Sequence, residues 1–205
     1  MVPVASPDPA TTRIIPPVLV LGYGNPGRLD DGLGPAFCTA LADRAPSGVV
    51  VRSAVQLVVE DAVRVARFAS VIFVDAALPD GTAFAFGPVP EVPGRVAFSS
   101  HMTSPEAIMA LARTLYGARS RGWTLAIRGD RFHGFGEGLS RTAQAHLHGA
   151  AGFLLRLLTD PPGPPAAPAG GSSEATVTPE QRPRPRRGGG DLRPGARIHP
   201  SPGSS

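Results

Sequence analysis

Acidic side chains in a glycine-rich loop are the first feature of this sequence that could do chemistry. Residues 18–34 read VLVLGYGNPGRLDDGLG, so the adjacent carboxylates of Asp30 and Asp31 follow an apolar run closely. Two further groups able to hold a metal come later: Asp75 ends a second apolar run, and His101 lies in a polar segment. Carboxylates with one imidazole suit a divalent first-row metal ion that keeps open coordination positions.

The same loop contains G-x-G-x-x-G, which is the pattern of a dinucleotide-binding turn. In that turn the helix begins at the glycines, so that its N–H groups meet the pyrophosphate. Here Pro26 lacks one donor, residues 28–31 precede the apolar helix pattern, and the carboxylates of Asp30 and Asp31 would repel a pyrophosphate. We therefore expect no nucleotide at this loop.

The elements that would position these groups alternate between strand and helix. Apolar runs and period-2 patterns predict strands at 17–22, 49–54, 70–75, 82–89 and 123–128, with 82–89 at an edge. Apolar spacing near 3.6 residues predicts helices at 33–43, 58–68, 103–116 and 140–158. Thr103 and Glu106 resemble a capping box around Pro105, and Ser140 is a candidate cap for the last helix. This alternation predicts an α/β fold, a three-layer αβα arrangement around a mostly parallel five-stranded sheet, of the phosphorylase/hydrolase-like kind.

Ligands of an open parallel sheet bind beyond the carboxyl ends of its strands. Asp31, Asp75 and His101 are expected to reach one such rim from three separate segments. Each also has an ordinary structural interpretation, because acids before a helix complement its dipole, strand-end aspartates cap turns, and most loop histidines bind nothing. Their spacing alone does not decide between these interpretations.

The composition excludes several classes of protein. All 20 basic residues are arginine, and the formal net charge of +4 drops to about +2 without the tail, with no basic stripe on a predicted helix. We therefore expect no nucleic-acid partner. The single cysteine, Cys38, excludes an internal disulfide and lies among apolar neighbours, which predicts a small buried side chain. The sequence has no signal-peptide pattern and no apolar run of about 18 residues, so we expect a cytoplasmic chain with no membrane partner.

Three segments differ in composition. Residues 1–15 are rich in proline and small side chains and predict a disordered leader. Residues 16–158 contain the alternating pattern and predict one domain. Residues 159–205 are rich in proline, glycine and arginine and have few large apolar side chains, which predicts a disordered tail.

Four blocks of the sequence, in order, resemble those of the hydrogenase maturation endopeptidases. They read VLVLGYGNPGRLDDGLG, QLVVEDAVRVARFASVIFVDA, SSHMTSPEAIMALARTLYG and GEGLS, and they extend over roughly residues 18–158. The resemblance implies an α/β peptidase that removes a C-terminal peptide from the precursor of a [NiFe] hydrogenase large subunit after nickel insertion. It places the metal-contacting positions at Asp31, Asp75 and His101, with Asp31 standing where the family commonly has glutamate.

The resemblance also implies that the nickel belongs to the substrate and that the three side chains detect it, although another divalent metal can substitute in vitro. The metal then polarises the scissile carbonyl, activates a water or positions the bond, and Asp31 or Asp75 is a candidate general base. No nucleophilic side chain is required, since Ser100 beside His101 is not part of a triad pattern. Glu137, between two glycines before Ser140, is a weaker candidate for substrate contact, and His133 has no assigned role.

Two other functions fit parts of the pattern. Peptidyl-tRNA hydrolases share the G-x-G-N-P-G loop, but they follow it with a histidine-containing segment, and this chain has no histidine before His101. A metal-sensing protein or chaperone of hydrogenase assembly would use the same three ligands without catalysis. Only a measurement of turnover separates this third function from a peptidase.

Overall fold

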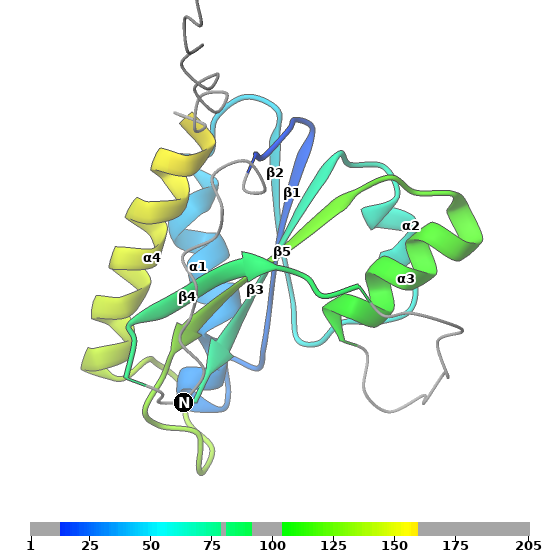
Figure 1. Ribbon diagram of the computed structural model, residues 1–205. Helices are drawn as coiled ribbons and strands as arrows, with labels where there is room; N and C mark the ends of the chain where they lie inside the picture. Colours follow the sequence, from blue (N-terminus) through cyan, green and yellow to red (C-terminus); the bar gives the residue numbers. More distant parts are fainter. Residues whose placement is uncertain (1–12, 79–80, 92–103, 160–205) are drawn as a thin grey trace, which may run out of the picture. The chain divides into compact units, whose positions relative to one another are not determined.

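The computed structural model describes residues 13–78, 81–91 and 104–159, all of which belong to one compact unit of the chain. Predictions for His101, Ser100, Thr103 and the tail therefore lie outside the described residues. The strands are β1 (Val18–Tyr23), β2 (Val49–Ala54), β3 (Ser70–Ala77), β4 (Phe84–Pro88) and β5 (Arg121–Arg128). The helices are η1 (Leu29–Gly32), α1 (Leu33–Ala42), α2 (Asp61–Val65), α3 (Pro105–Tyr116) and α4 (Arg141–Thr159) (Figure 1).

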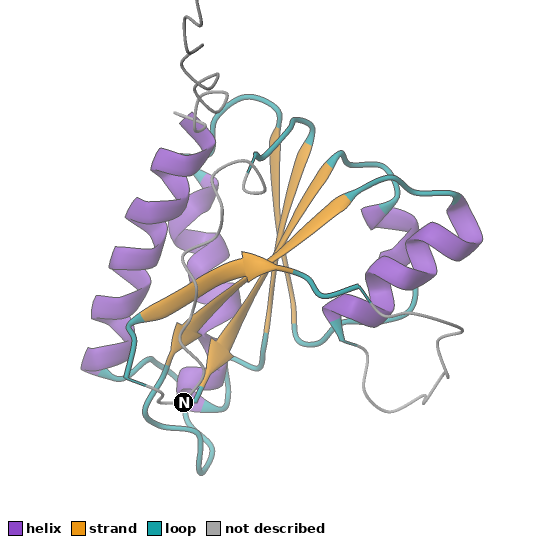
Figure 2. Ribbon diagram, in the orientation of Figure 1, coloured by secondary structure: helices purple, strands orange, loops and turns teal. Residues whose placement is uncertain are grey.

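The strands form one sheet in the order β2-β1-β3-β5-β4. The first four are parallel, while β4 pairs with β5 in the antiparallel direction and closes one edge. The five-stranded, mostly parallel sheet and the edge position of β4 are thus confirmed. Because the four parallel strands run in one direction, their carboxyl ends share one edge of the sheet, at the bottom of Figure 2.

Helices cover both faces of the sheet, which confirms the three-layer arrangement (Figure 2). Val18 and Val20 of β1 pack into the core on the side of α1 and α4. Leu19 and Leu21 pack into a second core, on the side of α2 and α3. A strand alternates its side chains between two faces, so a run that is apolar throughout is what a doubly covered strand requires.

Several predicted boundaries differ from those of the structure, and two of the differences have a clear cause. Strand β3 continues past Asp75 to Ala77, because its last residues pair with the end of β5. Asp75 therefore lies within the strand and is not its terminus. Helix α2 is only Asp61–Val65, shorter than the predicted 58–68, because the backbone at both ends forms bonds between residues i and i+3 in place of i and i+4.

One helix start and one short helix also differ from the prediction. The cap of α3 is Ser104, whose hydroxyl accepts from the N–H of Ala107 at 3.3 Å, and Pro105 occupies the first turn as expected. The one-turn 3-10 helix η1, which carries Asp30 and Asp31, had no counterpart in the sequence pattern. Among the described residues, no helix is long and apolar enough to cross a membrane.

Candidate functional site

The loop after β1 folds back so that Asp31 is held close to the end of that strand. Asp31 is partly buried, and its Oδ2 accepts a hydrogen bond from the backbone N–H of Asn25 at 2.9 Å. Gly24 makes this turn possible, since its φ is +136° and a Cβ there would lie 1.9 Å from the backbone oxygen of Asp31. Only glycine tolerates both the backbone conformation and the close approach. The glycines of the loop therefore position an acid.

Asp75 lies on the neighbouring strand, and its Oδ1 accepts a hydrogen bond from the N–H of Ala76 at 2.7 Å. Burial raises the pKa of Asp75, and the negative charge of Asp31 raises it further, while hydrogen bonds from Ala76 and Tyr23 act in the opposite direction. Strands β1 and β3 pair with Gly22 opposite Val74, and Asp31 is tied to Asn25 just after β1, so the two carboxylates lie at neighbouring strand ends. The structure thus brings two of the three predicted metal-contacting residues to the same edge of the sheet.

Tyr23 is a neighbour of this acid pair that the sequence analysis missed. Burial raises the pKa of Tyr23, and the nearby carboxylate of Asp75, to which its hydroxyl is hydrogen bonded, raises it further. The phenol therefore stays protonated and donates to Asp75. A signal was present in the sequence: Tyr23 follows Leu19 and Leu21 at period 2, on the same face of the sheet where Val71 and Phe73 precede Asp75.

The third predicted residue, His101, lies outside the described residues. Ser104 is the next described residue, and α3 begins at Pro105. Glu106, in the first turn of α3, is near enough for its charge to raise the pKa of Tyr23. The start of α3 therefore lies at the same edge of the sheet as the acid pair.

Asp30 has a different role from Asp31. Its side chain is fully buried, and its two oxygens accept four hydrogen bonds: from the N–H groups of Asp130 and Arg131 at 2.9 Å each, from Ser140 N at 2.6 Å and from Ser140 Oγ at 2.8 Å. Burial alone would raise the pKa of Asp30, but these donors outweigh it and lower the pKa. Asp30 therefore ties the loop after β5 to the loop after β1.

The loop between β5 and α4 is thus attached to the loop after β1 through backbone as well as side chains. Gly136 accepts from Leu29 N–H and donates to the oxygen of Gly27, both at 2.9 Å. Ser140 also caps α4 by accepting from Ala143 N–H at 3.1 Å, which confirms the predicted cap. Glu137 and His133 are both exposed on this loop.

Among the described residues, the site contains two of the three metal-contacting side chains expected from the sequence. In the described part of the chain, no group of three or more histidine, cysteine, aspartate or glutamate side chains is arranged to hold a metal ion. Asp31 and Asp75 supply two carboxylates, and none of the ion pairs found among the described residues includes either of them. Two neighbouring carboxylates outside those ion pairs fit a positive charge supplied from outside, completed by at least one further ligand.

Cys38 is not part of the candidate site at this edge of the sheet. Its side chain is buried, its thiol donates to the backbone oxygen of Arg52 at 3.0 Å, and burial raises its pKa to about 11. A thiol that remains protonated and shielded from solvent is a poor nucleophile. The prediction of a small buried side chain is confirmed.

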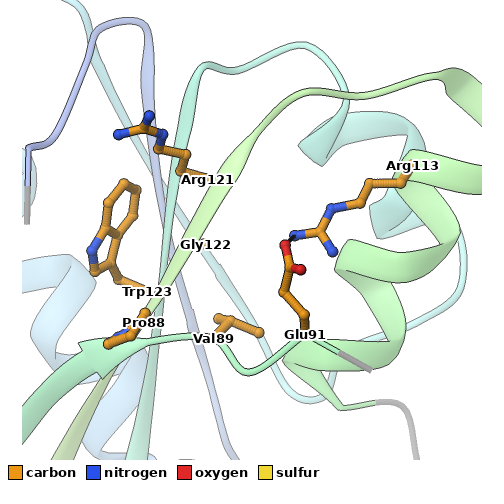
Figure 3. Close-up of a pocket in the computed structure, with 7 residues that line it drawn as sticks. All are labelled: Pro88, Val89, Glu91, Arg113, Arg121, Gly122 and Trp123. Atoms are coloured by element: carbon orange, nitrogen blue, oxygen red, sulfur yellow. Dashed lines mark ion pairs between the residues drawn. The ribbon is translucent and has the colours of Figure 1, made fainter. Parts of the chain in front are cut away.

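A hollow of about 390 Å³ lies away from the acid pair (Figure 3). It is bounded by the end of β4, the start of β5 and the side chain of Arg113, which pairs with Glu91 at 3.4 Å. Since β5 starts at the amino edge of the parallel strands, this hollow lies toward the edge opposite to Asp31 and Asp75. A smaller groove of about 230 Å³ adjoins the acid-bearing loop and is lined by Pro26, Leu29, Gly32, Pro35, Ala36, Thr39, Gly138 and Leu139.

The arrangement of strands and helices is that of solved hydrogenase maturation proteases. The maturation protease HycI from Thermococcus kodakarensis KOD1 superimposes with a TM-score of 0.56 at 18% identity, over 70% of this chain and 92% of that one. The maturating endopeptidase HybD from E. coli gives 0.55 at 20% identity, over 69% and 91%. HybD from Thermococcus kodakarensis gives 0.53 at 20% identity, over 69% and 98%. No model of a protein family and no curated protein matches the sequence.

Proposed function

We propose that this chain is a hydrolase, an endopeptidase that removes the C-terminal extension of a [NiFe] hydrogenase large-subunit precursor in the cytoplasm after nickel has been inserted. The observation that carries the proposal is the pair of carboxylates, Asp31 and Asp75, at the carboxyl edge of a sheet shared with solved hydrogenase maturation proteases. Four sequence blocks that resemble those of the same family support it.

Nickel in this proposal is part of the substrate. Asp31, Asp75 and His101 contact it and thereby distinguish a loaded precursor from an empty one. Burial is the main cause of the raised pKa of Asp75, and the negative charge of Asp31 adds to it. A cation between the two carboxylates would relieve this repulsion. Asp31 is shorter by one methylene than the glutamate common in the family, so the precursor approaches this loop more closely.

The reaction is the hydrolysis of one peptide bond. A water adds to the scissile carbonyl, a carboxylate accepts its proton, and the proton passes to the departing amine. Nickel beside the bond supplies positive charge that stabilises the developing oxyanion. The chain's own contribution is geometric, because Asn25 N–H fixes Asp31 while Ala76 N–H and Tyr23 fix Asp75.

The test is to incubate the chain with a nickel-loaded precursor from the same organism and to measure the mass of the precursor. We expect loss of one short C-terminal peptide, no loss from nickel-free precursor, and no processing by Asp75→Asn or His101→Ala. His133→Ala, an exposed histidine on another loop, is the matched control and should retain activity. A loaded precursor whose mass stays unchanged would reject the peptidase, and stable binding without cleavage would indicate an assembly protein.

A further inference from the structure

Some of the large apolar side chains that are exposed among the described residues lie at one edge of the sheet. Five of them lie on segments that follow the carboxyl ends of strands: Val55, Val58 and Val59 after β2, Leu78 after β3, and Phe135 after β5. The exposed fractions of Val55, Leu78 and Phe135 are 62%, 72% and 91%. Exposed apolar side chains scattered singly are normal, whereas a group around one site marks an interaction surface. We call these five residues the apolar rim.

The apolar rim is joined directly to the acid pair. Gly24 N–H donates to the backbone oxygens of Ala54 and Val55, each at 3.2 Å, and the next residue, Asn25, donates to Asp31. On the other side of the same loop, Gly136, the neighbour of Phe135, is bonded to Gly27 and Leu29. Leu78 follows Asp75 on the extension of β3. Apolar side chains therefore flank Asp31 and Asp75 from three loops.

The segment that presents Phe135 is held in place by hydrogen bonds within the chain. The four hydrogen bonds to Asp30 and the two backbone bonds of Gly136 attach its loop to the loop after β1. The guanidinium of Arg28 lies 6.0 Å from the ring centre of Phe135 and orients the ring. A preorganised aromatic side chain loses little conformational freedom when it is covered, which favours tight binding.

We propose that the apolar rim is the docking surface for the folded body of the precursor, with the substrate's cation seated at its centre. This inference rests on the proposed function. Charge complementarity selects this occupant: the described ion pairs leave Asp31 and Asp75 without a cation, so the partner brings a positive centre surrounded by apolar side chains. The groove of about 230 Å³ beside Leu29 and Gly138 receives one further apolar side chain of the precursor.

The test measures binding and cleavage separately, with nickel-loaded precursor as the probe. Val55→Ser and Phe135→Ser should each raise the dissociation constant about tenfold. The double variant should raise it about a hundredfold, because side chains on separate loops contribute nearly independently. Leu115→Ser and Tyr116→Ser are matched controls, since these residues are 61% and 50% exposed at the end of α3, toward the opposite edge of the sheet. Thermal melting verifies that all variants remain folded.

The outcomes separate the docking surface from the peptidase. Rim variants that bind as tightly as wild type, or no more weakly than the controls, overturn the docking surface even if cleavage proceeds. Weak binding by rim variants together with no cleavage by wild type supports the docking surface and rejects the peptidase. Wild type that neither binds nor cleaves the precursor overturns both.

Discussion

Replacing Asp30 by asparagine tests whether one buried carboxylate holds the acid-bearing loop in place. The asparagine side chain would keep one acceptor oxygen and bring an NH₂ group into a place surrounded by donors. If its oxygen takes the position of Oδ2, the bonds from Asp130, Arg131 and Ser140 Oγ remain, while the NH₂ faces the N–H of Ser140. The substitution therefore weakens three hydrogen bonds and loses the fourth, because the new NH₂ group and the N–H of Ser140 are both donors.

The magnitude follows from the difference between charged and neutral hydrogen bonds. A bond to an ionised group contributes about 1.5–3 kcal/mol, a neutral one about 0.5–1.5 kcal/mol, and an unsatisfied buried donor costs about 1–3 kcal/mol. Relief from burying a charge offsets part of this sum. We expect Asp30→Asn to lower the free energy of unfolding by about 2–4 kcal/mol at neutral pH, out of roughly 5–15 kcal/mol for a domain.

Urea unfolding at several pH values is the assay. The folded state lowers the pKa of Asp30 below its ordinary value of 3.8, so its ionised form stabilises the protein above that value. This contribution is lost as the pH falls through the lowered pKa. The difference in unfolding free energy between wild type and Asp30→Asn should therefore be largest at neutral pH and decrease in acid.

The matched control is Asp130→Asn. The Asp130 side chain is 33% exposed and its only described ion pair, with Arg128, is long at 3.6 Å, so we expect a change below about 1 kcal/mol. An Asp30→Asn protein as stable as this control, or a gap that stays constant with pH, would refute the role given to Asp30.

Three further predictions concern the surroundings of the acid pair. Gly24→Ala should lower the free energy of unfolding by about 2 kcal/mol or more and abolish processing, because the new Cβ meets the backbone of Asp31. Urea unfolding measures the first effect and the mass of the precursor the second. A variant as stable and active as wild type would contradict the role given to Gly24 in the turn. Tyr23→Phe should lower the processing rate roughly tenfold, since it removes a donor to Asp75, whereas the exposed Tyr116→Phe should not. Cys38 should resist a thiol reagent at about pH 8 in the native state and react on unfolding, and rapid native labelling would show that it is not buried.

The order of elements and the role of several single residues were predictable from sequence, because local patterns encode them. Apolar runs and period-2 patterns located all five strands, and Ser140 capped α4 as expected. Boundaries failed where the deciding interaction was distant. Strand β3 is longer because β5, which begins only at Arg121, pairs with its last residues.

The two adjacent acids show where tertiary structure decides. The sequence by itself determined that both follow β1, at the edge where parallel strands end. It did not separate Asp30 from Asp31, since both have the same chemistry and neighbouring positions. Only the fold brings Ser140 and the backbone of residues 130–131 to Asp30, and Asp75 to Asp31. Buried donors satisfy the carboxylate of Asp30, while that of Asp31 lies beside a like charge. This difference in environment gives Asp30 a structural role and makes Asp31 a candidate for the chemistry.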